Sequence, residues 1–169
     1  MALIRDAAEP SELDDVRSLM RAFVAWHRER HAADAALIDR YFDERAFAEE
    51  LAGLPGKYAP PNGRLLIAYQ DGQAAGCVAL RDLGDGICEM KRMFVPATFR
   101  GLGIGRALAD RVIADARIAG YERMRLDTSW RQDEAMRLYE RLGFKRIPPY
   151  YDLPDDLKAW LVFFELPLQ

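Results

Sequence analysis

Cysteine and histidine are scarce in this chain, which has two of each among its 169 residues. Cys77 and Cys88 lie within apolar, strand-like runs. With His27 and His31 they form neither a Cys-x-x-Cys nor a His-Glu-x-x-His pattern, so the clustered ligands of a zinc site are missing. A disulfide-based scaffold needs more cysteines than these. We therefore expect two small buried core residues, joined at most by one disulfide, and no metal.

An excess of one charge and a long apolar run are also missing. The 24 basic and 27 acidic residues give a formal net charge of -3, whereas a nucleic-acid-binding domain is expected to be basic. No run approaches the ~18 apolar residues of a membrane-spanning helix. The first residues, Met1–Asp6, lack the apolar segment of a signal peptide. These absences predict a cytoplasmic protein with no nucleic-acid partner and no membrane partner.

Length and composition indicate a single domain over residues 1–169. Half of the residues are hydrophobic and 30% are charged, as in soluble globular proteins. A chain of this length buries roughly 70% of its unfolded surface, so one ordinary core is enough. We expect this domain to be a monomer or a homodimer.

Apolar residues at helical spacing predict two helices in the first third of the chain. The segment Pro10–Glu12 opens the first, with Ser11 as its N-cap, because a serine side chain there can accept a bond from a free backbone amide. The second runs from Ile38 or Asp39 to Leu51, after which a Pro-Gly pair breaks the chain.

Strand patterns follow in the middle of the chain. The Asp71-Gly72 pair is a strong hairpin signal between the first two strands. The expected elements are strands over Leu65–Tyr69, Ala74–Leu80 and Ile87–Val95, a helix over Gly103–Ala119, a strand over 123–128, a helix over 135–142 and a strand over Leu161–Leu166. The order β-α-α-β-β-β-α-β-α-β is a mixed α/β (α+β) pattern, which predicts a mostly antiparallel sheet with helices on both faces.

The segment Arg100–Arg106, Arg-Gly-Leu-Gly-Ile-Gly-Arg, opens the helix that follows the third of these strands. Glycines at a helix start let a ligand approach the backbone closely, and the free amides there, with the helix dipole, form an anion site. Two arginines add positive charge. The alternative is an ordinary helix start in which the glycines only shape a turn, although three alternating glycines carry a cost in chain entropy.

Two common phosphate motifs do not fit this loop. A Walker loop needs Gly-x-x-x-x-Gly-Lys-Ser/Thr, whereas Arg106 stands five places after Gly101. A dinucleotide fingerprint needs Gly-x-Gly-x-x-Gly, and its third glycine is missing in either register. The antiparallel strands before the loop are also wrong for a dinucleotide-binding fold.

At Arg100, Gly103 and Gly105 the chain resembles the GNAT superfamily of acetyl-CoA-dependent N-acetyltransferases, whose signature is Arg/Gln-x-x-Gly-x-Gly/Ala. The segment Met93–Pro96 is similar to the end of that family's fourth strand. Residues 135–144 are similar to its Ala-x-x-Leu-Tyr-x-x-x-Gly-Phe helix. The resemblance covers roughly residues 64–150.

This resemblance implies a GNAT-like fold with six to seven strands, splayed between strands 4 and 5 by a bulge, and acetyl-CoA as co-substrate. Backbone amides of 101–106 would bind the CoA pyrophosphate, and residues 93–95 would bind the pantetheine arm and the acetyl group. The implied cofactor-binding residues are Met93, Phe94, Val95, Arg100, Gly101, Leu102, Gly103, Ile104, Gly105 and Arg106.

One position departs from the family. Seven residues before the helix tyrosine the family often has asparagine, and this chain has Gln132. Asparagine caps a helix better than glutamine does. We therefore expect Asp133 or Ser129 to cap this helix instead.

Glu89 is the candidate general base. An amine acceptor with a pKa near ~10.4 arrives protonated, and attack on a thioester needs the neutral amine. Glu89 lies six residues before Val95, where the histone-modifying branch of the family also has a glutamate. The alternatives are a solvent-facing strand carboxylate without a catalytic role, and a chain of water molecules as the base.

Tyr139 is the candidate general acid, because it matches the tyrosine of the family's helix motif. A phenol with a pKa of ~10 is suited to a departing thiol with a pKa near ~8.5. The alternative is a core residue on the apolar face that it shares with Leu138 and Leu142. The resemblance places the oxyanion at backbone amides near Phe94 or Val95.

Aromatic residues and histidines of the first two helices are candidates for the acceptor pocket, or else ordinary core and surface residues. They are Trp26, His27, His31, Tyr41 and Phe42. The segment Tyr150–Asp152 is either a lid or a packed irregular segment. Strand alternation predicts Lys91 on the face of Glu89 and Arg92 on the other face, and a cation beside the base would favour an acceptor that bears a carboxylate.

The sequence leaves three functions open. The first is an N-acetyltransferase whose partner is a small-molecule amine, attacked directly in a ternary complex. The second is a protein or peptide N-acetyltransferase, which needs an open groove. The third is a non-catalytic acetyl-CoA-binding module that keeps the glycine loop without the chemistry.

Overall fold

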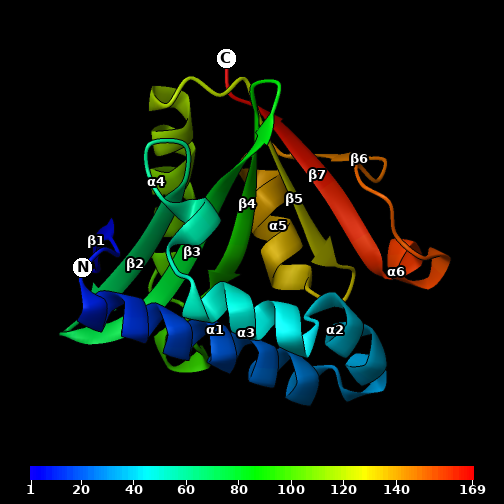
Figure 1. The fold of residues 1–169 in the computed structure, drawn as a ribbon, viewed down its shortest axis with the longest axis horizontal. Helices are drawn as coiled ribbons and strands as arrows, with labels where there is room; N and C mark the ends of the chain where they lie inside the picture. The colour runs from blue at the N-terminus through cyan, green and yellow to red at the C-terminus, as the bar shows by residue number, and fades with distance from the viewer.

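A seven-stranded sheet with helices on both faces forms the fold in the computed structural model, which describes residues 1–169 (Figure 1). The strands are β1 (Leu3–Asp6), β2 (Arg64–Gln70), β3 (Gln73–Gly84), β4 (Ile87–Phe94), β5 (Arg123–Ser129), β6 (Lys145–Ile147) and β7 (Leu161–Pro167). Their order in space is β1-β2-β3-β4-β5-β7-β6, and only the β4–β5 pair is parallel. The expected mixed, mostly antiparallel sheet is confirmed.

Two helical layers bury the two faces of this sheet. The helices are α1 (Pro10–Arg30), α2 (Ala35–Tyr41), α3 (Glu44–Ala52), α4 (Ile104–Ile118), α5 (Asp133–Arg141) and α6 (Asp155–Trp160). One core lies between the sheet and α4 with α5, and the other lies between the sheet and α1, α2, α3 and α6. None of these helices combines the length and apolarity that a membrane span requires.

The first half of the chain corrects two predictions. The single helix expected up to Leu51 is two helices, because the chain leaves helical geometry at Phe42 and Asp43 starts α3 by accepting a bond from the Ala46 amide at 2.9 Å. Helix α1 has Glu9 rather than Ser11 at its N-cap, and the Glu12 carboxylate accepts a bond from the Glu9 amide at 3.0 Å.

Two short elements were missed. Strand β6, before Pro148, has three residues and α6, after Pro154, has six, too few for a periodic pattern to be recognised. Other local signals are confirmed. Asp71 and Gly72 have φ of 50° and 77°, the left-handed values of a primed hairpin turn. Both cysteines are buried free thiols.

Strands β4 and β5 separate along their length, and this feature creates the site. They pair only where residues 87–89 of β4 meet residues 123–125 of β5. Figure 1 shows them diverging toward the layer of α1, α2 and α3, with α5 visible through the opening. A bulge accompanies the split: Ala79 faces Lys91 while Cys77 faces Phe94, so β4 has one extra residue, and Arg92 has a φ of 58°. The expected splay between strands 4 and 5 is confirmed.

Candidate active site

The glycine loop before α4 has the geometry of an anion site. Gly101 and Gly103 have φ of 80° and 77°, and no atom lies within 4 Å of where their side chains would begin. Gly103 is the N-cap of α4, and no side chain caps this end. The first amide bonded within the helix is that of Ala107, to the Gly103 carbonyl at 3.0 Å, so the amides of 103–106 lack helical partners. Such an end fits a diphosphate.

A cleft of about 520 Å³ lies over this loop, between the end of β4 and the start of α5. It is lined by most of the residues that the sequence analysis assigned to cofactor binding: Met93, Phe94, Val95, Arg100, Gly101, Gly103, Ile104, Gly105 and Arg106. The Arg100 guanidinium lies 4.5 Å from the Trp26 ring centre and donates to the Val95 carbonyl at 3.1 Å. Leu102 is 59% exposed at the loop surface and does not line the cleft.

The cleft continues into the narrow slot between β4 and β5, because Met93 and Gln132 line both spaces. Tyr139 of α5 lies on one side of the slot, packed in the core against the rings of Phe144 and Phe164. It is 6% exposed, and burial raises the pKa of its phenol well above the usual value. A phenol with a raised pKa keeps its proton at neutral pH and is available as a hydrogen-bond donor.

Beyond the slot lies a second cavity of about 460 Å³, on the α6 side of the sheet. Tyr41, Lys91 and Arg92 line both the slot and this cavity, so the two spaces meet at these side chains. The irregular segment after β6 closes one side through Tyr150, Tyr151 and Leu153. This segment is therefore packed against the site.

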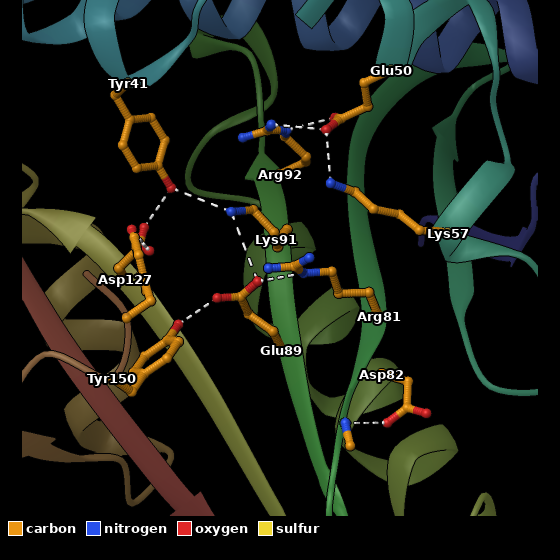
Figure 2. Close-up of polar contacts among 12 residues, drawn as sticks. Tyr41, Glu50, Lys57, Arg81, Asp82, Glu89, Lys91, Arg92, Asp127 and Tyr150 are labelled. Carbon is orange, nitrogen blue, oxygen red and sulfur yellow. Dashed lines mark hydrogen bonds and ion pairs between the residues drawn. The ribbon is translucent and has the colours of Figure 1, made fainter. Parts of the chain in front are cut away.

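Glu89 lies on the wall of this cavity and is 1% exposed (Figure 2). Its Oε1 accepts a bond from Arg81 at 2.7 Å and lies 3.8 Å from the Lys91 ammonium, while its Oε2 accepts a bond from the Tyr150 hydroxyl at 2.5 Å. Burial acts to raise the pKa of this carboxyl, but Lys91, Tyr150 and Arg81 outweigh it and hold the pKa below the usual value. Glu89 is thus a firmly ionised carboxylate rather than a solvent-facing one.

The bulge corrects the predicted direction of Arg92. Alternation placed it on the face opposite Glu89, but the extra residue in β4 turns its side chain to the same face as Lys91 (Figure 2). There its guanidinium donates to both oxygens of Glu50 on α3, at 2.8 and 3.0 Å. This buried, bidentate pair fixes α3 to the point where β4 leaves β5.

Asp127 was missed as a site residue. It lines the slot from β5 and accepts bonds from two hydroxyls, that of Tyr41 and that of Tyr151, the latter at 2.7 Å. The sequence offered a weak signal in the alternation of 123–128, which gives β5 one polar face. Tyr41 was expected near the acceptor, but its link to Asp127 joins residues 86 apart and has no local signature.

The other residues expected at the acceptor pocket lie elsewhere. Trp26 and His31 line the cleft over the glycine loop, and Phe42 and His27 line the slot. His27 is 1% exposed and stacked on Trp160, and burial lowers its pKa to about 4, so its imidazole is neutral at physiological pH.

Helix α5 starts without the side-chain cap that was expected from Asp133 or Ser129. Its N-cap residue is Gln132, which caps no backbone amide. The Gln132 side-chain nitrogen instead lies 3.4 Å from Nε2 of His27. The glutamine is thus directed at the slot wall rather than at the helix end.

Comparison with known protein families identifies the family of this chain. The model of the acetyltransferase (GNAT) family matches residues 19–144, three quarters of the chain, including the glycine loop and the α5 motif. The chain belongs to the GNAT family. It is an N-acetyltransferase by family, and its relatives and fold agree.

Three similar proteins agree with this family assignment. An uncharacterised N-acetyltransferase of Schizosaccharomyces pombe is 36% identical over 147 residues, covering 86% of this chain and 83% of that protein. An N-acetylaspartate synthetase of Danio rerio is 35% identical over 127 residues, covering 72% of this chain and 45% of that protein. The solved structure of the PaiA N-acetyltransferase of Thermoplasma acidophilum, in complex with coenzyme A, matches with a TM-score of 0.73 at 15% identity, covering 99% of each chain.

The GNAT fold gives the three spaces an order. The glycine-loop cleft, the β4–β5 slot and the second cavity lie next to one another, because the first two share Met93 and the last two share Lys91 in their walls. The arrangement has one entrance suited to a phosphate ligand and another lined by charged side chains.

Proposed function

We propose that this GNAT enzyme transfers an acetyl group from acetyl-CoA to a primary amine of a small molecule, by direct attack in a ternary complex. The observation that carries the proposal is the β4–β5 slot, which joins a cleft suited to a diphosphate to a separate cavity of about 460 Å³. The amine nitrogen forms a bond to the acetyl carbon, the carbon–sulfur bond breaks, and one proton leaves the nitrogen while one reaches the sulfur.

The chain's own groups supply the donor site. The free amides of 103–106 would hold the pyrophosphate at the α4 N-terminus, where the helix dipole favours negative charge. Beyond the bulge, β4 has no neighbour on its β5 side, so its backbone groups near Met93 and Phe94 are free to bind an amide-containing arm. The family and a coenzyme A complex of a similar fold support acetyl-CoA as the donor.

We propose Glu89 and Tyr139 as the catalytic groups. Each oxygen of a carboxylate has two lone pairs, so Glu89 Oε2 can accept a proton in addition to the bond from Tyr150. Because the pKa of Glu89 is low, it takes the proton once the carbon–nitrogen bond has made the nitrogen acidic. Tyr139, protonated and lining the slot, donates to the departing sulfur.

Direct attack is favoured over an acyl-enzyme because the chain has no activated thiol. Burial raises the pKa of Cys77 to about 12 and that of Cys88 to about 12. The thiolate is the nucleophilic form of cysteine, and it is negligible at neutral pH with such values. Neither cysteine lines the slot or the two spaces beside it.

A small acceptor is favoured because the second cavity has packed walls. Tyr150 and Tyr151 are held on one side of it by hydrogen bonds to Glu89 and Asp127, which narrows the space available to a protein chain. The name of the Danio rerio relative, an N-acetylaspartate synthetase, also points to a small molecule. A protein acceptor and a non-catalytic binding module are the competing functions.

A turnover assay with acetyl-CoA and a panel of amines and peptides tests the proposal. We expect release of free CoA thiol together with an acetylated small amine of matching mass. Preference for peptides would replace the small acceptor by a protein. Binding of acetyl-CoA without thiol release on any amine would identify a binding module and overturn the catalytic proposal.

A further inference from the structure

Lys91 and Asp127 lie on either side of one hydroxyl at the point where the slot meets the second cavity (Figure 2). The Lys91 ammonium donates to the Tyr41 hydroxyl at 3.5 Å, and that hydroxyl in turn donates to Asp127. A cation and an anion are therefore presented side by side at the slot mouth. Neither Lys91 nor Asp127 has an oppositely charged partner to itself.

Lys91 shares its nearest carboxylate, that of Glu89, with Arg81. Its side chain is 15% exposed, and the nearest carboxylate oxygen, on Glu89, is 3.8 Å away and already bonded to Arg81 at 2.7 Å. The other cations of the cavity each have a separate partner: Arg92 pairs with Glu50, Arg125 with Glu165, and Arg40 with Asp156. A buried ammonium with three donors and one long hydrogen bond has capacity for an anion.

Asp127 is a carboxylate without a cationic partner, as its contacts show. Both of its oxygens accept bonds from tyrosine hydroxyls, those of Tyr41 and Tyr151, and it forms no ion pair with a lysine or arginine. Hydroxyls orient a carboxylate without neutralising it. An ammonium group in the slot mouth would meet this charge directly.

We propose that the acceptor is an α-amino acid, whose carboxylate binds Lys91 and whose amine lies toward Asp127 and the slot. An α-amino acid carries its two opposite charges on one carbon, which suits a cation and an anion that are separated by one hydroxyl. Its nitrogen then lies at the slot mouth, where the adjoining cavity wall carries Glu89, and its side chain extends into the cavity lined by Arg81, Arg125 and Tyr150. The inference rests on the proposed function and adds the chemical class of the acceptor.

The experiment compares each standard L-amino acid with the primary amine that lacks only its carboxylate, using the full chain and acetyl-CoA. For accepted side chains we expect kcat/KM to be about tenfold or more higher for the amino acid, because a charge-assisted bond is lost in the amine. Lys91→Met should remove this advantage, mainly by raising KM for the amino acid. Because Lys91 also lowers the pKa of Glu89, each amino acid is compared with its matched amine in the same variant, so that a change in the base affects both substrates and leaves their ratio unaffected.

Two further variants separate this role from a structural one. Lys91→Arg keeps the cation and should keep the preference. Lys57→Met is a matched control, because Lys57 lies outside the cavity and pairs with Glu50, so the ratio between amino acid and amine should not change. Thermal unfolding establishes that each variant is folded.

The outcomes distinguish the inference from the function on which it rests. Amines acetylated as well as their amino acids, or Lys91→Met lowering both equally, overturn the inference alone. No turnover with either member of any pair overturns the proposed function and the inference with it. A carboxylate preference that disappears in Lys91→Met and persists in Lys57→Met supports both.

Discussion

At the scale of single residues, the site depends on where ionisable groups hold their protons. Glu89 is 1% exposed but has three donors around it, so its pKa lies below the usual value and it is a carboxylate at neutral pH. Tyr139 is surrounded by apolar neighbours, and burial raises the pKa of its phenol, so it remains protonated. These states suit the proposed roles, in which Glu89 accepts a proton and Tyr139 donates one.

These fixed states predict different pH signatures for two conservative variants. Glu89→Gln should lower kcat/KM most at low pH, where the acceptor arrives as an ammonium, and much less where the amine is already neutral. Tyr139→Phe should lower kcat by about 10²-fold at every pH up to the basic limb, because a general acid that never loses its proton contributes equally throughout. Acetyl-CoA affinity should hardly change in either variant.

The measurement is kcat and kcat/KM against pH, beside the dissociation constant for acetyl-CoA. Tyr121→Phe is the matched control, since Tyr121 is also buried but bonds the Asn62 carbonyl at 2.6 Å and lines none of the three spaces. A uniform loss for Glu89→Gln, or no loss, would assign the base to water. An unchanged kcat for Tyr139→Phe would return Tyr139 to a core role.

At the scale of elements, the site is made by two departures from regular structure. In β4 the bulge holds Arg92 in a left-handed conformation, which costs roughly 1–2 kcal/mol for a residue with a side chain. The bidentate pair with Glu50 of α3 holds that conformation in place. At the start of α4, Gly103 adopts a similar φ without the cost, because it has no side chain.

Gly103 therefore gives a test of the glycine loop. Gly103→Val should weaken acetyl-CoA binding by about tenfold or more, because a branched side chain blocks close approach to the helix N-terminus. Gly120→Val is a control with the same backbone demand: its φ is 91°, its surroundings are equally open, and it follows the other end of α4. Both variants should lose stability, but only Gly103→Val should lose affinity in a titration. Equal affinities in the two folded variants would remove the pyrophosphate from this loop.

At the scale of the whole molecule, the features that depend on residues close together in the chain could be predicted from the sequence. The Asp71-Gly72 turn, the β2–β3–β4 meander and the glycine loop each depend on neighbours in the chain, and all were predicted from them. The split between β4 and β5 was predicted from the family resemblance rather than from residue patterns. The bulge at Arg92 contains no glycine or proline that would indicate it in the sequence.

The relations between distant segments were not predictable. Tyr41 meets Asp127 and Tyr150 meets Glu89 only because α2 and the segment after β6 pack over the same end of the sheet. These contacts join residues 86 and 61 positions apart, where no periodicity operates. The break before α3 at Asp43 was missed for a related reason, since apolar spacing continues across it and only the cap marks the new helix.

Direct transfer inside the slot is the central claim, and initial-velocity kinetics test it most directly. Rates are measured with acetyl-CoA and the accepted amine both varied, in the unmodified protein. Because the proposed reaction has both substrates in the slot together, and because burial keeps both cysteines in the thiol form, the double-reciprocal lines should intersect. Parallel lines, together with an acetylated protein isolated before amine is added, are the ping-pong signature and would contradict this account.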